Sequence, residues 1–213
     1  MNKEHRRQFI HLSGFIFVLA AQIIGGLLIS VYCFMIAFFF LIYSYYLRYE
    51  KRKINVIIRK LEQLETKFRD FTMGNARPDE IETKFLSGPF WFFLGFGITF
   101  LVFPLPIASA ACSILAVGDC FSNFVGRRYG RRKITTGRTV EGSLAFIVSS
   151  FAASLLFVSP ITGIAGALSG AGAEILRKPN DNLIIPIASG IIMVVLYTIT
   201  GMGIENIIWL CSI

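Results

Sequence analysis

The feature that most constrains this chain is a series of long apolar stretches, separated by short segments that hold nearly all of its charge. Backbone groups in lipid must be hydrogen-bonded internally, so a membrane-spanning chain forms either helices or a closed barrel. The run from Phe34 to Leu41 lacks the alternation of a barrel strand. Only 16% of the residues are charged, whereas a soluble domain carries about 25%. We therefore predict an all-α, polytopic integral membrane protein.

An apolar helix of about 20 residues crosses the hydrocarbon core. The apolar stretch from Phe9 to Leu47 is too long for one span, and Gly25-Gly26 divides it. Gly166 and Gly170 are four residues apart, a spacing that lets another helix approach closely. We predict one membrane domain over residues 1–213, with about seven transmembrane helices at 9–24, 27–47, 85–103, 107–121, 143–158, 161–176 and 184–200.

The charges test this seven-span topology. It puts the N-terminus and residues 48–84, 122–142 and 177–183 on one side of the membrane. Those segments carry all 21 Lys and Arg residues. All the carboxylates except Glu205 lie in these segments or at the span ends next to them, as Asp119 and Glu174 do. The positive-inside rule then predicts a cytoplasmic N-terminus and an active site facing the cytoplasm, in a cell membrane or an endoplasmic-reticulum-type membrane. The net charge of +8 suits a cytoplasmic surface next to anionic membrane lipids or an anionic substrate. Because membrane placement explains the basic residues, no nucleic-acid partner is expected.

Residues 48–84 form the one sizeable polar region. Apolar residues from Ile54 to Phe71 recur three and four positions apart, which is the helical period, with Lys and Arg beside them. This pattern predicts a cytoplasmic amphipathic helical insertion at the membrane surface; a linker helix packed on the bundle fits it equally well. Met73-Gly74-Asn75 should end that helix, and Pro78 should start a short second one.

Residues 118–142 carry the candidate chemistry, and we expect them to bind a nucleotide. If the span at 107–121 continues as a helix, one stripe of it holds Asp119, Ser122, Asn123, Gly126 and Gly130. Glycines there would let a phosphate or a sugar approach the backbone. The neighbouring cations could pair with phosphate oxygens; they are Arg127, Arg128, Arg131, Arg132 and Lys133. A positive-inside anchor loop would also explain these cations, but not Asp119 or the spacing of the glycines.

Two carboxylates of this segment are candidate catalytic residues. Glu141 opens the next helix, with Thr139 as its cap, and Arg138 is a possible partner of Glu141. Mg²⁺ is usually held by one or two carboxylates together with substrate phosphates. Asp119 and Glu141 are therefore predicted to hold Mg²⁺, with Glu174 as a further metal ligand.

The ends of other spans add candidates on the same side. Glu174 ends the glycine-rich span and Asp181-Asn182 opens the last one, either as site residues or as partners of the cations at 177 and 178. Arg7 and His11 share a helix face at the start of the first span. His11 is a candidate for phosphate contact or proton transfer.

These residues resemble the CTP-dependent lipid kinase family, which includes dolichol kinases, phytol kinases and yeast-type diacylglycerol kinases, with the phosphatidate cytidylyltransferases as relatives. The family pattern has an aspartate, two glycines four apart, a basic spacer and Lys-Lys-Thr-x-Glu-Gly. The matching residues here are Asp119, Gly126, Gly130, Thr139, Glu141 and Gly142. Ser122 stands in place of an alanine, and Gly137-Arg138 in place of the two lysines.

The resemblance implies transfer of the γ-phosphoryl group of CTP, with Mg²⁺, to a polyprenol-, dolichol- or phytol-like alcohol, giving its monophosphate. Asp119 and Glu141 would hold Mg²⁺ or orient the alcohol. The residues expected around the nucleotide are Ser122, Asn123, Gly126, Arg127, Gly130, Lys133, Arg138, Thr139 and Gly142. The alternative is a cytidylyltransferase that makes a CDP-activated lipid. A small membrane transporter is less favoured, because the ionisable groups gather on one side.

Overall fold

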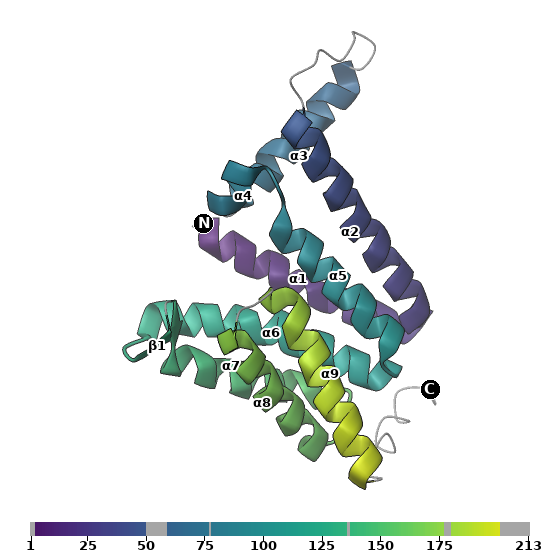
Figure 1. Ribbon diagram of the computed structural model, residues 1–213, viewed down its shortest axis with the longest axis vertical. Helices are drawn as coiled ribbons and strands as arrows, with labels where there is room; N and C mark the ends of the chain where they lie inside the picture. Colours follow the sequence, from purple (N-terminus) through teal and green to yellow (C-terminus); the bar gives the residue numbers. More distant parts are fainter. Residues whose placement is uncertain (1–2, 50–58, 77, 136, 177–179, 201–213) are drawn as a thin grey trace.

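The computed structural model describes residues 3–49, 59–76, 78–135, 137–176 and 180–200, and these are almost entirely helical (Figure 1). The elements in chain order are α1 (Lys3–Ile24), α2 (Gly26–Tyr49), α3 (Arg59–Asn75), α4 (Pro78–Thr83), α5 (Ser87–Val102), α6 (Leu105–Tyr129), β1 (Lys133–Thr135), β2 (Arg138–Thr139), α7 (Val140–Ser154), α8 (Pro160–Leu176) and α9 (Asp181–Thr200).

Each of the seven apolar stretches forms a helix, close to its predicted bounds. The break between α1 and α2 falls at Gly25, whose φ of 90° lies in the left-handed region that glycine adopts without steric cost. The span expected at 107–121 does continue as a helix, the condition for the polar stripe: α6 runs to Tyr129, and Gly130 is its C-cap. In the insertion, α3 ends at Asn75 and α4 begins at Pro78, as predicted. Ile54, Ile57 and Ile58 and the apolar C-terminal residues 202–213 lie outside the described residues.

The all-α prediction was wrong for the basic segment after α6. There β1 and β2 form an antiparallel pair, with Lys133 opposite Thr139. Gly137, with a φ of 88°, lies between the two strands. A turn of this kind needs a residue that tolerates positive φ. Gly137 is also the residue that stands in place of the first of the two lysines in the family pattern. We call residues 127–139 the basic hairpin segment.

Helix α6 lies at the centre of the bundle, in contact with α1, α7 and α9 (Figure 1). Of its apolar window, 67% is buried, against 28% for α2 and for α9. Its inward positions are small, which lets neighbouring helices approach closely; the fully buried ones include Ala108, Ser109, Ala110, Ala111, Cys112 and Ser113. The burial explains how α6 holds a fixed position for the polar residues at its end.

Three described helices are long and apolar enough to cross a membrane: α2, α6 and α9. Shorter apolar helices are found at Ile10–Ile24, Ser87–Val102 and Val140–Ser154. Large apolar side chains are exposed on the outer faces of the bundle, among them Ile23, Val148 and Ile199. Such a surface suits lipid rather than water, so the fold is that of a helical membrane protein. The number of seven spans and the cytoplasmic N-terminus stay predictions.

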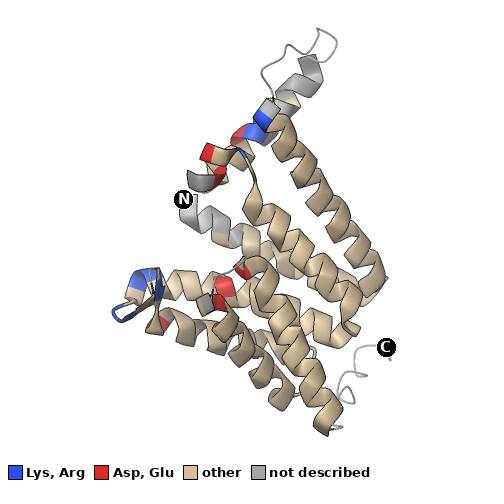
Figure 2. Cartoon of the chain, in the orientation of Figure 1, with Lys and Arg blue, Asp and Glu red and all other residues tan. Residues whose placement is uncertain are grey.

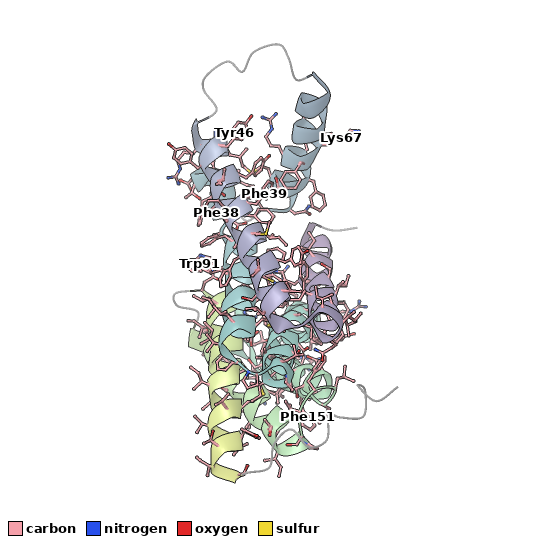
Figure 3. All side chains as sticks on the ribbon, turned by 90° about the vertical axis from the view of Figure 1, so that its right-hand side faces the viewer. Phe38, Phe39, Tyr46, Lys67, Trp91 and Phe151 are labelled. Atoms are coloured by element: carbon pink, nitrogen blue, oxygen red, sulfur yellow. The ribbon has the colours of Figure 1, made fainter. Side chains whose placement is uncertain are left out.

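The charged residues gather at one side of this bundle. In Figure 2 the coloured residues lie at the basic hairpin segment, at the corner formed by α3 and α4, and near the start of α9, while most of the rest of the described chain is tan. Figure 3 shows Phe39 of α2 beside α3, which carries Lys67, and the rings of Phe39 and Phe68 of α3 have centroids 5.8 Å apart. Phe68 of α3 packs edge-on against Tyr43, with ring centroids 5.1 Å apart. The insertion is therefore docked on the bundle, as the linker-helix interpretation expects.

Gly166 and Gly170 of α8 lie at close helix contacts, as predicted. A Cβ on Gly170 would lie 2.9 Å from Ile114 Cγ2 of α6 and 2.9 Å from Ser189 Oγ of α9. A Cβ on Gly172, on the same helix, would meet nothing within 4 Å.

These two glycines give a matched pair of variants. Gly170→Ala should lower the free energy of unfolding by about 1–3 kcal/mol, the usual cost of overpacking a core. Gly172→Ala should be neutral or raise it by up to about 1 kcal/mol, because alanine favours helix over glycine. Thermal unfolding in detergent measures both. Equal effects of the two substitutions would contradict this account of α8 packing.

Candidate active site

Arg138 is the centre of a buried ionic cluster formed by four elements. Its side chain is 5% exposed, and its Nη1 lies 2.5 Å from Oε1 of Glu174, which is fully buried. Its Nη2 lies 3.5 Å from Oδ1 of Asp119 and 3.3 Å from Oδ2 of Asp181. Ser122 completes the group: its hydroxyl donates to Glu174 Oε1 at 2.6 Å and accepts from Arg138 Nη1 at 3.4 Å. We call Arg138, Asp119, Ser122, Glu174 and Asp181 the Arg138 cluster.

The cluster forms because polar residues at four element ends meet. Asp119 and Ser122 lie on consecutive turns near the end of α6, and Glu174 lies in the last turn of α8. Asp181 is the first residue of α9, while β2 brings in Arg138. The sequence predicted Glu174 as a further metal ligand beside Asp119 and Glu141, but left Glu174 and Asp181 open between a site role and pairing with the cations at 177 and 178. The structure brings Asp119, Glu174 and Asp181 to one guanidinium.

His11 of α1 extends the cluster on one side. Its Nδ1 lies 3.8 Å from Asp119 Oδ2, within ion-pair distance. Its ring meets Phe92 of α5 edge-on, with centroids 5.2 Å apart. Asp119 therefore lies between a buried cation and an imidazole. The predicted neighbour of His11, Arg7, is on α1, but its side chain lies outside the described residues.

The cluster carries more negative than positive charge. Counting each group as ionised, three carboxylates and one guanidinium have a formal charge of −2. Two of its buried atoms, Arg138 Nε and Glu174 Oε2, have no hydrogen-bond partner within the described residues. Because an unpaired buried polar atom is costly, these atoms favour an additional polar group at the site.

The donor chemistry of the cluster fits Mg²⁺, with one change from the predicted ligand set. Asp119 and Asp181 are 13% and 18% exposed, so their oxygens remain accessible. No three His, Cys, Asp or Glu side chains in the described part converge on one metal position, because Arg138 stands between the carboxylates. Mg²⁺ typically takes only one or two carboxylates plus phosphate oxygens. Asp119 with Glu174 or Asp181 meets that requirement.

Glu141, which was predicted to hold Mg²⁺ with Asp119, contacts the backbone of the basic hairpin segment. Its Oε2 accepts a hydrogen bond from the backbone N–H of Arg131 at 3.1 Å, and the N–H of Arg132 lies 3.4 Å from both oxygens. The pairing with Arg138 was wrong, because Arg138 is taken up by the other three carboxylates. Hydrogen bonds from backbone N–H groups, that of Glu141 itself first, lower the pKa of its carboxyl. Glu141 therefore ties α7 to the basic hairpin segment.

Replacing Glu141 by alanine should loosen the basic hairpin segment. The amides of Arg131 and Arg132 would lose their acceptor, so their hydrogen exchange should become faster, measured by mass spectrometry in detergent. Folding lowers the pKa of Glu141. The ionised carboxylate therefore stabilises the folded state fully above the ordinary carboxyl pKa, and this stabilisation is lost as the pH falls through the lowered pKa of the folded protein. The wild type should thus show the same loosening at acidic pH. Exchange that is unaffected by both changes would contradict this role.

The two glycines of the predicted stripe do not face open space. Other residues lie close to where a Cβ atom would be. A Cβ on Gly126 would lie 3.1 Å from Thr139 Oγ1 and 3.4 Å from Gly142 Cα, and one on Gly130 would lie 2.6 Å from Thr139 Cγ2. The interpretation that these positions admit a phosphate from that direction was wrong, because β2 and the start of α7 fill the space. Thr139 is the predicted N-cap, since its hydroxyl accepts from the N–H of Gly142 at 3.1 Å.

The remaining candidates divide into exposed and structural positions. Arg127 and Lys133 are exposed on the basic hairpin segment, on a surface that an anionic ligand could reach. The Nδ2 of Asn123 donates to the carbonyl of Asp119, one turn earlier. Asn182 is buried, and its Nδ2 donates to the carbonyl of Gly88 at 3.2 Å, which joins α9 to α5. Asn182 therefore holds the start of α9, and with it Asp181, in place.

Comparison with known proteins gives partial matches. The chain is 27% identical, over 87% of its length and 90% of the other, to an uncharacterized protein of Rickettsia prowazekii. It is 38% identical over 78 residues to dolichol kinase of Saccharomyces cerevisiae and 32% identical over 87 residues to a probable chloroplastic phytol kinase of Zea mays. The matches span 14% and 27% of the two kinases.

No family model matches the chain, and no solved structure does. The similarity to the two kinases covers 34% and 39% of this chain. It supports a relationship to the lipid kinases that the motif around Asp119 resembles.

Proposed function

We propose that this protein transfers the γ-phosphoryl group of CTP to the hydroxyl of a membrane lipid alcohol. The observation that carries the proposal is the Arg138 cluster, in which three carboxylates, one buried and two partly exposed, surround one buried guanidinium, with His11 next to Asp119. Phosphoryl transfer requires mainly positioning and charge neutralisation. The local similarity to dolichol kinase and phytol kinase supports an alcohol as the acceptor.

The nucleotide would approach from the basic hairpin segment. Its exposed cations are Arg127, Arg128, Arg131, Arg132 and Lys133. Phosphates and the Arg138 cluster, both negative, would repel each other without a cation between them. Mg²⁺ held by Asp119 and by Glu174 or Asp181 would supply that charge neutralisation. Glu141 acts indirectly, by holding the backbone of the hairpin segment in position.

The acceptor would approach from the side of His11. In the transfer, the bond between the γ-phosphorus and the oxygen of the leaving CDP breaks, and a bond to the alcohol oxygen forms. The hydroxyl proton passes to the imidazole of His11, which Asp119 orients and stabilises as the cation. The products are the lipid monophosphate and CDP.

CTP labelled at either the α- or the γ-phosphorus tests this proposal. The purified protein in detergent is incubated with Mg²⁺, a lipid alcohol and each labelled nucleotide, and the lipid is extracted. A kinase places the γ label in the lipid and leaves the α label in CDP. A cytidylyltransferase places the α label in the lipid when a lipid phosphate is supplied. Absence of both labels from the lipid, with CTP, ATP and a panel of alcohols, would contradict the proposal.

A further inference from the structure

A second feature borders His11, and no residue of the Arg138 cluster lines it. A cavity of about 160 Å³ lies between α1, α2, α5 and the α3–α4 insertion. Its apolar wall is largely aromatic; the rings are Phe17, Phe40, Phe71, Phe92 and Phe93. We call it the aromatic cavity. His11 lines it and faces Asp119 as well, so one imidazole is shared by the ionic site and the cavity.

The aromatic cavity also has an unpaired polar group in its wall. Asn75 is 8% exposed, and its Nδ2 donates to the carbonyl of Phe71 at 2.7 Å. Its Oδ1 is buried and has no hydrogen-bond partner within the described residues. Leaving such an acceptor unpaired is costly, and a ligand that donates one hydrogen bond would remove that cost. An alcohol hydroxyl is such a donor.

The wall of the cavity is joined to the ionic site by hydrogen bonds. Glu80 of α4 is buried and accepts from the hydroxyl of Ser87 at 2.9 Å and from the N–H of Gly88. The carbonyl of Gly88 accepts in turn from Asn182, next to Asp181 of the Arg138 cluster. The insertion, the start of α5 and the start of α9 are thus held as one unit. The cavity therefore has a fixed position relative to Asp119.

We infer that the aromatic cavity holds the hydroxyl end of a single-chain lipid alcohol. This inference rests on the proposed function and names its acceptor site. The hydroxyl lies at the polar wall of His11 and Asn75, and the carbons next to it lie among the phenylalanine rings. An apolar protein cavity of about 150 Å³ binds benzene, so this one accepts about six carbons, close to one isoprene unit. A diacylglycerol, with two acyl esters beside its hydroxyl, is too wide.

The test uses a diazirine analogue of geraniol as a photolabel, with no nucleotide present. In the wild type the label should map to the peptide that contains Phe92 and Phe93. Unlabelled geraniol should compete with it, whereas 1,2-dioctanoylglycerol should not. Thr72 lines the cavity, so Thr72→Phe should reduce labelling at least tenfold. The control Thr66→Phe makes the same change at an exposed position of α3 and should leave labelling unchanged.

A second variant tests the hydrogen bond and does not depend on filling the cavity. In the wild type, geraniol should compete about fivefold better than its methyl ether, which cannot donate a hydrogen bond. Asn75→Leu should remove that preference. Equal labelling of wild type and Thr72→Phe, equal competition by dioctanoylglycerol, or an unchanged preference in Asn75→Leu would each overturn the inference. Specific labelling without phosphoryl transfer would refute only the proposed function; transfer by a Thr72→Phe variant that is not labelled would refute only the cavity.

Discussion

Replacing Asp119 by asparagine should lower kcat for phosphoryl transfer to the lipid alcohol by about 10²- to 10⁴-fold, the usual contribution of a positioned acid–base pair. Asparagine keeps the size of the side chain and removes its charge. His11, 3.8 Å from Oδ2 of Asp119, would lose the carboxylate that stabilises its protonated form. Asp119 is also a proposed Mg²⁺ ligand, so the Mg²⁺ concentration at half-maximal rate should rise. The measurement is transfer of labelled γ-phosphate across a range of Mg²⁺ concentrations.

Two other substitutions separate this role from general disturbance of the cluster. Asp181→Asn also removes a contact with Arg138, at 3.3 Å, but it keeps Asp119, whose Oδ2 lies 3.8 Å from His11. It should therefore cost less in kcat than Asp119→Asn. Asp70→Asn changes an exposed carboxylate on α3 and should leave the rate unchanged. An Asp119→Asn protein as active as Asp70→Asn would contradict the assignment.

The helices of this protein could be predicted closely, and the reason is local. Apolar composition and glycine or proline breaks are properties of consecutive residues, so Gly25, Asn75 and Pro78 mark helix boundaries in the sequence and in the structure alike. The stripe from Asp119 to Gly130 follows from the helical period alone. The helical period cannot show whether the surface in front of the stripe's glycines is open. In the structure it is filled by Thr139 of β2 and Gly142 of α7.

The partners of the ionic residues could not be predicted, because they come from distant parts of the chain. Arg138 and Glu141 are close in sequence, and that proximity favoured a pair between them. The small hairpin instead turns Glu141 toward the backbone of Arg131, whereas Arg138 reaches Glu174, 36 positions along. Asn75 gives a similar case: the sequence indicates only a helix end there, and its position in a cavity wall depends on five helices packing together.

Replacing Arg138 by methionine should have the largest effect on stability, a loss of about 3–5 kcal/mol in the free energy of unfolding. Arg138 is 5% exposed and contacts three carboxylates, one of which, Glu174, is fully buried. Without the guanidinium, Glu174 would keep only the hydroxyl of Ser122, at 2.6 Å. Thermal or denaturant unfolding in detergent measures the loss. The free energy of unfolding of Arg138→Lys should lie between those of the wild type and Arg138→Met. Lysine keeps the positive charge, but its ammonium cannot contact several carboxylates in the planar arrangement of a guanidinium.

Two further variants test whether the loss of stability comes from leaving the buried carboxylate of Glu174 without its cation. Arg128→Met removes an exposed arginine beside the ring of Tyr129 and should cost less than about 1 kcal/mol. In the double variant Arg138→Met/Glu174→Leu the buried charge is gone as well, so most of the lost stability should return. Its phosphoryl transfer should stay low, since a proposed Mg²⁺ ligand is missing. A double variant no more stable than Arg138→Met would mean that the guanidinium stabilises the fold through Asp119 and Asp181 rather than through Glu174.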